Sequence, residues 1–368
     1  MIHLIFGLPA LYVGVRFVWP LQWPLALKLV LVAGLLVGSQ FHYWNRLSSG
    51  SIFSPEYSRP LILLFNWTIG VVLLLAAMQV ILDVVSLGSR MITGGWSVPH
   101  ALRYAAGVLA MLVAAFGVWQ AARVPPLKDV EVRIRNLPAE FDGYRLLQLT
   151  DLHASRMFPA SWVRAVVERS LTLGVDLIVV TGDFIDGTVE ARRDDIEPLT
   201  ALRAPDGVWA VTGNHEYIFG AAAWKPRIAE LGIRILSNEH VVLRRGEAAL
   251  VLAGVEDLSA GSRAHDLDAV LEGAPAGAPV LLLDHQPRQA HAAAERGVAL
   301  QLSGHTHGGM LVGLDRLVAR ANAGFVSGAY ALEGMTLYVN NGTGLWPGFA
   351  LRLGRPSELT RITLRRAL

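Results

Sequence analysis

Residues 300–309 read LQLSGHTHGG, a short apolar run followed at once by two histidines set among glycines. The apolar residues are typical of a buried strand, and the glycines let the backbone come close to a bound group. His305 and His307 are two residues apart, so they project to the same side of an extended segment. This stretch predicts a sheet strand that ends at a site able to bind metal.

Four other segments have the same form, in which an apolar run ends and metal-binding side chains follow directly. They are YRLLQLTDLH (144–153), LIVVTGD (177–183), GVWAVTGNHE (207–216) and VLLLDH (280–285). In an α/β sheet, ligands bind beyond the strand ends, where loops direct side chains toward one point. Five such ends bring together Asp, His and Asn side chains, which are the ligand types of a hydrolytic two-metal centre.

The composition divides the 368 residues into an apolar first third and a second part of alternating charged and apolar segments. The change falls at Pro125-Pro126, so we expect domains at 1–124 and 125–368, the second long enough to bury its own core. The absence of cysteine excludes disulfides and thiolate zinc sites. The net charge of +2 comes with no long basic run, so nucleic acid is not expected as a partner.

The apolar third contains four segments close to the length of about 20 mostly apolar residues that a membrane-spanning helix needs. They cover residues 2–18, 25–41, 61–82 and 101–118. Tryptophans near their ends are typical of an interfacial belt: Trp19, Trp23, Trp44, Trp67, Trp96 and Trp119. We interpret Gln79 and Asp83 as interfacial, and favour this over a functional role within the helix bundle. A four-span domain in the cell (inner) membrane is therefore expected, and the positive charges do not decide which side bears the second domain.

The two-metal hypothesis assigns a role to each ligand-type residue. Two divalent ions about 3.5–4 Å apart need a bridging carboxylate and several outer ligands. Asp183 is the expected bridge, because it follows a strand in a tight glycine-containing turn. The expected outer ligands come from the other strand ends: Asp151, His153, Asn214, His285, His305 and His307.

The five motifs, in this order, resemble those of the calcineurin-like metallophosphoesterase superfamily. They are Asp151-x-His153, Gly182-Asp183-x-x-Asp186, Gly213-Asn214-His215-Glu216, His285 and Gly304-His305-x-His307. The tail, with residues 341–344 and 352–364, is similar to that of the subgroup typified by the YkuE and YaeI phosphoesterases, and the apolar third resembles the superfamily's transmembrane members. The resemblance implies an α-helical four-span membrane domain followed by an α/β metallophosphoesterase domain, a β-sandwich flanked by helices.

The resemblance also implies two divalent metal ions, which would be Mn, Zn or Fe. Asp151, His153, Asp183 and His307 would hold the first ion, and Asp183, Asn214, His285 and His305 the second. His215 would stabilise the transition state or protonate the leaving oxygen, and Asp186 would orient His215 through its other ring nitrogen. Both are therefore the expected catalytic residues.

Some residues depart from the family pattern without removing a ligand. Gly187 stands where phosphoprotein phosphatases of the superfamily carry arginine, which argues against a phosphoprotein substrate. Met310, Asp284 and Arg288 replace the Gln, the Ser or Ala, and the Asp that are usual in the subgroup. These positions bear on substrate fit and not on metal binding.

Several other residues receive structural roles. His240, His265 and His291 have no ligand-type neighbour at matching spacing, so we interpret each as structural. Glu216 is expected to support the metal loop through hydrogen bonds. For Trp346, Pro347 and Phe349, ordinary packing is favoured over an apolar lip for a lipid chain.

These observations predict a membrane-anchored phosphoesterase that hydrolyses a phosphodiester or pyrophosphate bond by attack of a hydroxide generated at the metals. The expected partners are the bilayer and a lipid-linked or nucleotide-containing phosphate substrate such as UDP-2,3-diacylglucosamine. An alternative is a membrane sensor or scaffold built on an inactive phosphoesterase fold, and the intact ligand set and His215 argue against it. A transporter with a regulatory esterase domain is disfavoured because the spans hold few charges.

Overall fold

The computed structural model describes residues 2–93, 98–263 and 265–367, and the chain divides into two compact units. The helical unit comprises Met1–Ala121 and Pro347–Leu351, and the sheet unit comprises Ala122–Trp346 and Arg352–Leu368. The short segment Pro347–Leu351 therefore belongs to the helical unit by its contacts, although more than two hundred residues separate it from Ala121 in the chain.

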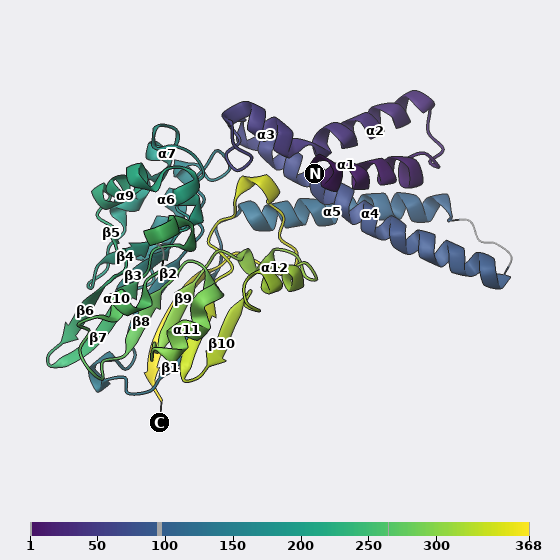
Figure 1. The fold of residues 1–368 in the computed structure, drawn as a ribbon. Coiled ribbons are helices and arrows are strands. Elements are labelled where there is room, and N and C mark those ends of the chain that lie inside the picture. The colour runs from purple at the N-terminus through teal and green to yellow at the C-terminus, as the bar shows by residue number, and fades with distance from the viewer. Residues whose placement is uncertain (1, 94–97, 264, 368) are drawn as a thin grey trace. The chain divides into compact units, whose positions relative to one another are not determined.

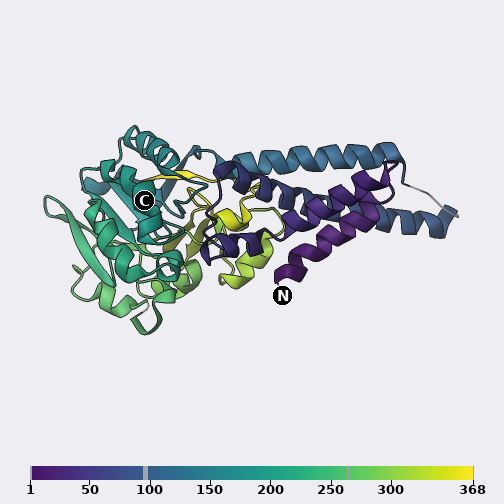
Figure 2. The same ribbon diagram turned by 90° about the horizontal axis from the view of Figure 1, so that it is seen from above.

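Apolar helices make up the helical unit. They are α1 (Ile2–Val13), continued by the π-helical turn Gly14–Val18, α2 (Leu25–Ser39), α3 (Phe41–Ser49), α4 (Arg59–Thr93) and α5 (His100–Ala122). Helices α1 and α2 pack on each other and both pack on α4 (Figures 1 and 2). Large apolar side chains such as Val30, Ile81 and Leu112 nevertheless stay exposed on the outer faces. An apolar exterior of this extent fits a lipid environment.

Two of these helices are long and apolar enough to cross a membrane alone, Arg59–Ile92 and His100–Ala122. Leu25–Ser39 and Phe41–Ser49 are bent by 53° and make a third span if they count as one. The structure thus supports two to three of the four predicted spans. The helix breaks after Ser39 because Gln40 leaves helical geometry, and the first segment is only a short apolar helix.

Polar side chains of the helical unit join α1, its π-helical extension and α4. Arg16 donates to both carboxylate oxygens of Asp83, at 2.8 and 3.0 Å. Tyr12 and Gln79 each donate to the same carboxylate at 2.7 Å. These bonds compensate a charge that is costly within an apolar bundle. Asp83 and Gln79, interpreted from the sequence as interfacial, therefore take part in an interhelical network.

The residues singled out in the sequence as belt or lip lie in different surroundings. Trp96 lies outside the described residues. Trp67 forms a hydrogen bond between two helices, because its indole nitrogen donates to the carbonyl of Met111 on α5 at 3.0 Å. Of the residues considered as a lip, Pro347 and Phe349 are buried and belong to the helical unit. There Asn66 donates to the carbonyl of Pro347 at 3.0 Å, so this segment is packed.

The sheet unit is built from two six-stranded sheets. The first has the order β1-β12-β2-β3-β4-β5: β1 (Leu127–Ile134), β12 (Leu359–Arg366), β2 (Arg145–Leu149), β3 (Leu177–Thr181), β4 (Val208–Val211) and β5 (Arg234–Ile235). The second has the order β10-β11-β9-β8-β7-β6: β10 (Gly328–Leu332), β11 (Met335–Val339), β9 (Leu300–Ser303), β8 (Val280–Leu283), β7 (Ala248–Gly254) and β6 (Glu239–Arg245). Strands β2–β5 are parallel, as are β7, β8, β9 and β11, so their carboxyl ends meet at one edge of each sheet.

A single apolar core fills the space between the sheets. It contains Leu146 and Val179 from the first sheet and Leu252 and Leu302 from the second, all fully buried. The outer faces are covered by α6 (Ala160–Leu171), α7 (Val189–Ile196), α9 (Ala221–Glu230), α10 (Leu267–Leu271) and α11 (Ala290–Glu295) (Figure 1). Fully buried strands need apolar cover on both faces, which explains their continuous apolar runs. The predicted α/β fold with two sheets is confirmed.

Candidate metal centre

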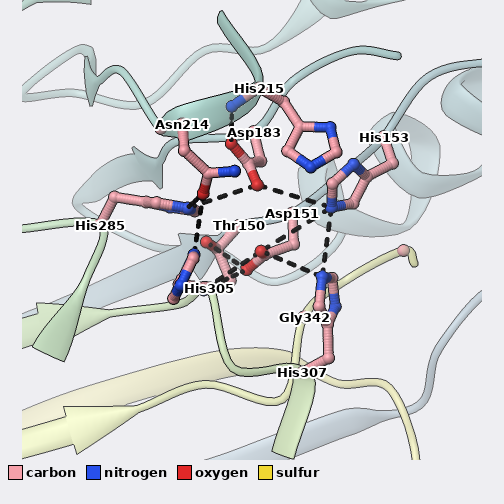
Figure 3. A network of polar contacts seen from close by, with 12 residues as sticks. Thr150, Asp151, His153, Asp183, Asn214, His215, His285, His305, His307 and Gly342 are labelled. Atoms are coloured by element: carbon pink, nitrogen blue, oxygen red, sulfur yellow. Dashed lines mark hydrogen bonds and ion pairs between the residues drawn. The ribbon is translucent and has the colours of Figure 1, made fainter. Parts of the chain in front are cut away.

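The carboxyl ends of β2, β3, β4, β8 and β9 direct their following residues to one place, shown in Figure 3. Each metal ligand predicted from the sequence lies there: Asp151, His153, Asp183, Asn214, His285, His305 and His307. Five of them have a positive φ between 47° and 67°: Asp151, His153, Asp183, His305 and His307. Non-glycine residues rarely adopt this left-handed conformation, and it persists only where the surroundings enforce it. The loops therefore store backbone strain at the point where the side chains converge.

The first group contains Asp151, His153 and His307, with Asp183 beside it. The Nε2 atoms of His153 and His307 are 3.2 Å apart, and Nε2 of His307 lies 3.5 Å from Oδ1 of Asp151. Nε2 of His153 lies 3.8 Å from the same oxygen and 3.7 Å from Oδ2 of Asp183. All four side chains are buried. Ligand atoms of Asp151, His153 and His307 all lie within 4.8 Å of one another, close enough to hold one metal ion, and Asp183 adds a carboxylate oxygen beside them.

The second group contains Asn214, His285 and His305, again with Asp183. Nδ1 of His285 lies 2.7 Å from the carbonyl of Thr181, so this nitrogen carries the proton. The opposite nitrogen, Nε2, therefore presents a lone pair, and it faces Oδ1 of Asn214 at 3.0 Å and Oδ2 of Asp183 at 3.3 Å. Lone pairs that converge in this way repel each other unless a cation lies among them. The donor set accordingly fits a divalent metal ion.

Asp183 belongs to both groups, as a bridging ligand must. Its Oδ2 faces His153 and His285, while its Oδ1 accepts a hydrogen bond from the backbone nitrogen of His215 at 2.8 Å. Glu216 holds the turn that carries Asp183, because its carboxylate accepts from the backbone nitrogens of Asp183, Phe184 and Gly213 at 2.7–3.0 Å. The predicted supporting role of Glu216 is thus present in the structure, and it ties two of the strand-end loops together.

His215 lies beside the metal ligands without joining either group of four. Its Nδ1 is 2.5 Å from Oδ1 of Asp186, as predicted. The same carboxylate oxygen also lies 3.2 Å from Nδ1 of His153. Asp186 therefore orients both His215 and His153, and only the contact with His215 was predicted from the sequence.

Burial and neighbouring charge set the protonation of the group. Burial would lower the pKa of His285, but the carboxylate of Asp183 outweighs it and raises that pKa well above its ordinary value. Burial and the neighbouring His285 lower the pKa of His305 to about 4, and burial holds the pKa of His307 well below its ordinary value. Burial would raise the pKa of Asp183, yet His285 and His215 hold it well below the usual range. His305 and His307 are therefore neutral and Asp183 is ionised, the forms that bind a cation, whereas a cation would have to displace the proton that Asp183 favours on His285.

Arg352, which received no role from the sequence, lies behind the metal ligands. This buried guanidinium donates to the carbonyls of His307, Asn341, Gly344 and Arg355 at 2.6–3.0 Å. Burial lowers its pKa to about 10. The backbone nitrogen of Gly344 in turn donates to the carbonyl of Asp151 at 2.9 Å. Arg352 thus connects the loop of His307 with the tail; the signal in the sequence is an arginine within the apolar run 349–353.

The histidines interpreted as structural lie apart from the two groups. His240 contacts the carbonyl of Val270 at 2.8 Å, and His291 lies against the ring of Phe325. His265 does have an acidic neighbour in space, since its Nε2 is 2.8 Å from Oδ2 of Asp284. That pair lies 19 residues apart in the chain, so spacing along the sequence could not reveal it.

Comparison with known proteins agrees with this geometry. The family model described as calcineurin-like phosphoesterase matches residues 144–309. The chain is 33% identical over 272 residues to a zebrafish (Danio rerio) transmembrane protein with metallophosphoesterase domain, covering 71% of this chain and 62% of the relative. It is 30% identical over 236 residues to the metallophosphoesterase YkuE of Bacillus subtilis, covering 62% of this chain and 82% of the relative. A 5′-nucleotidase precursor from Thermus thermophilus is similar in structure, with a TM-score of 0.41 at 17% identity, over 60% of this chain and 54% of that chain.

The chain belongs to the calcineurin-like phosphoesterase family, which the relation to YkuE shows over most of that protein's length. The predicted family is thereby confirmed. The chain spans 62% and 63% of the length of the zebrafish and cattle transmembrane relatives.

Proposed function

We propose that this protein is a membrane-anchored, dinuclear-metal phosphoesterase that hydrolyses a phosphodiester or pyrophosphate bond. The observation that carries the proposal is the convergence of two ligand groups on one carboxylate, Asp183. Asp151, His153, Asp183 and His307 would hold one ion, and Asp183, Asn214, His285 and His305 the other. Two divalent ions held there supply a water molecule of lowered pKa and neutralise charge on the phosphoryl oxygens.

The residues around the ligands supply the remaining chemistry. His215 would hold a proton at Nε2 for the leaving oxygen in its imidazolium form, because burial, which would lower its pKa, is outweighed by the carboxylates of Asp183 and Asp186, which raise it. Asp186 keeps the imidazole in this orientation and at the same time orients His153. Glu216 preserves the loop geometry that sets Asp183 between the two groups. Burial of these side chains limits water, which strengthens each electrostatic interaction.

The helical unit supports a membrane-anchored form of this enzyme, and we place all four predicted segments in the bilayer. Its exposed apolar faces fit lipid, and two to three of its helices qualify as spans by length and composition. Residues 1–124 would then form the anchor in the inner membrane and residues 125–368 the catalytic domain. An enzyme anchored in this way meets amphiphiles at high local concentration, so a lipid-linked phosphodiester or pyrophosphate is the proposed substrate class.

Hydrolysis by the detergent-purified full chain, stripped of metal and reloaded with Mn²⁺, tests the proposal. The substrates are bis-p-nitrophenyl phosphate, p-nitrophenyl phosphate and UDP-2,3-diacylglucosamine. Asp183→Asn and His215→Ala should abolish Mn²⁺-dependent hydrolysis, whereas the control His240→Ala, at a histidine apart from the two ligand groups, should retain it. Stoichiometric metal binding without turnover of any phosphodiester or nucleotide-lipid would contradict the proposal and favour a sensor with an inactive fold.

A further inference from the structure

Exposed apolar side chains are unevenly distributed over the sheet unit. Among its described residues only three large hydrophobic side chains are exposed: Ile218, Val312 and Leu317. Ile218 ends α8 (Asn214–Ile218), the short helix that begins with Asn214 and His215. Val312 is five residues from His307, and it is 71% exposed. The apolar exposure of this unit is therefore confined to segments that follow predicted site residues directly.

Residues 310–321 carry two of these three side chains and form a distinct surface segment, here called the rim segment. It contains α12 (Asp315–Ala321), which is labelled in Figure 1. This helix has no buried residue. Leu317 on α12 is 59% exposed. A helix with an outward apolar residue and no fully buried residue has an unpartnered face.

The rim segment also carries unpaired positive charge. Arg316 and Arg320 are exposed and lie one helical turn apart, so they share a face next to Leu317. Among the described residues neither guanidinium forms an ion pair, whereas the neighbouring Asp315 is paired with Arg355 at 2.7 Å. Exposed apolar groups flanked by free arginines are the composition of elements that lie in the headgroup region of a membrane.

The rim segment pairs with the chain just after Pro347–Leu351. The backbone nitrogen of Val312 donates to the carbonyl of Leu353 at 3.1 Å, and that of Leu353 donates to the carbonyl of Met310 at 3.0 Å. Leu353 follows by two residues the segment Pro347–Leu351, which belongs to the helical unit. The rim segment is therefore hydrogen-bonded to the tail of the sheet unit at Leu353.

We propose that the rim segment docks on the surface of a bilayer containing anionic lipids, with Val312 and Leu317 among the acyl chains and Arg316 and Arg320 at the headgroup phosphates. The inference rests on the proposed function, since it specifies how the metal centre meets a lipid-linked substrate. Docking brings the loop of His307 to the level of the headgroups, where the phosphoester of such a substrate lies.

The absence of cysteine allows a direct test by site-specific labelling of the full chain. Val312→Cys and Leu317→Cys are each labelled with the fluorophore NBD and reconstituted into vesicles of phosphatidylcholine and phosphatidylglycerol. The control Glu247→Cys is exposed in the turn between β6 and β7, at the opposite end of the sheet from the metal ligands. Lipids with a nitroxide near the headgroup should quench the labels at 312 and 317 several-fold more strongly than the label at 247.

Charge reversal supplies the second measurement. Arg316→Glu with Arg320→Glu, on the Leu317→Cys background, should lose most of the quenching in anionic vesicles. The matched control reverses two exposed arginines of α6, Arg164→Glu with Arg169→Glu. This control should leave the quenching of the label at 317 unchanged. Quenching at 312 and 317 no stronger than at 247 would overturn the proposal. So would label self-quenching that rises with protein density and not with nitroxide lipid, which would identify a second copy of the chain as the occupant.

Activity is measured separately in the same samples with water-soluble bis-p-nitrophenyl phosphate and Mn²⁺. Strong lipid quenching without any hydrolysis would support docking and count against the phosphoesterase proposal. Hydrolysis without preferential quenching would support the phosphoesterase and refute docking. The two proposals can therefore fail independently.

Discussion

Gly213 provides a sharp test of the view that Asp183 must sit undisturbed between the two ligand groups. Its backbone, at φ −107° and ψ −175°, is allowed for alanine, so Gly213→Ala adds no backbone strain. The added methyl carbon would, however, lie 2.2 Å from Oδ1 and 2.6 Å from the backbone nitrogen of Asp183. Because a comfortable contact is about 3.5 Å, the carboxylate must move by roughly 1 Å.

That displacement has a predictable cost. It breaks the hydrogen bond from the backbone nitrogen of His215 to Oδ1 of Asp183, which is 2.8 Å long in the structure. Loss of a buried hydrogen bond to a charged group costs about 1.5–3 kcal/mol, and overpacking adds about 1–3 kcal/mol. The free energy of unfolding of the sheet unit should fall by roughly 2.5–6 kcal/mol. Misorientation of the bridging ligand should weaken Mn²⁺ binding by about 10–100-fold or more.

Denaturant unfolding in detergent and chelator competition for Mn²⁺ measure the two effects. Gly232→Ala is the matched control, because its Cβ would have no neighbour within 4 Å but its φ is +82°. It should lose about 1–2 kcal/mol through backbone strain and keep its affinity for Mn²⁺. If Gly213→Ala bound Mn²⁺ as tightly as the unsubstituted chain, the assignment of Asp183 as the bridging ligand would be refuted.

Three further outcomes are expected. Asp186→Asn should lower kcat by at least about tenfold while metal stays bound, because it weakens the orientation of both His153 and His215; an unchanged kcat in steady-state assays would contradict this role. Arg352→Lys should reduce the free energy of unfolding, measured by denaturant titration, by about 2–4 kcal/mol, because an ammonium group cannot reach all four carbonyls. In the same titration the control Arg355→Lys, at a half-exposed arginine, should cost at most about 1 kcal/mol. Removal of metal by chelation should lower the stability by about 2.7 kcal/mol relative to free metal at about 100 times its Kd, and a thermal melt insensitive to chelation would speak against a metal centre.

Much of the fold and the ligand set could be read from local sequence. Each ligand follows an apolar run within a few residues, as His285 follows β8 and His305 follows β9. Parallel strands bring their carboxyl ends to one edge, so the convergence of the side chains follows from the strand pattern. The apolar composition of the first third likewise predicted helices in the right places, because the length of an apolar run is also a local property.

The number of spans was less predictable. A single helix was expected for residues 25–41, but Gln40 interrupts it and α3 continues at 53°. Hydropathy averages over such a break, because it measures apolar content and not backbone geometry. The structure therefore supports two to three spans where composition alone suggested four.

By itself the sequence predicted the two-part organisation, the α/β class and the residues proposed as metal ligands, because each prediction depends on residues close together in the chain. Only the tertiary structure decided that Asp186 serves both His153 and His215, and that the buried Arg352 holds the loop of His307. Only the structure also assigned Pro347–Leu351 to the helical unit, where Asn66 binds it across 281 residues of sequence. Contacts of this range depend on how the elements pack, and no local pattern of side chains records that packing.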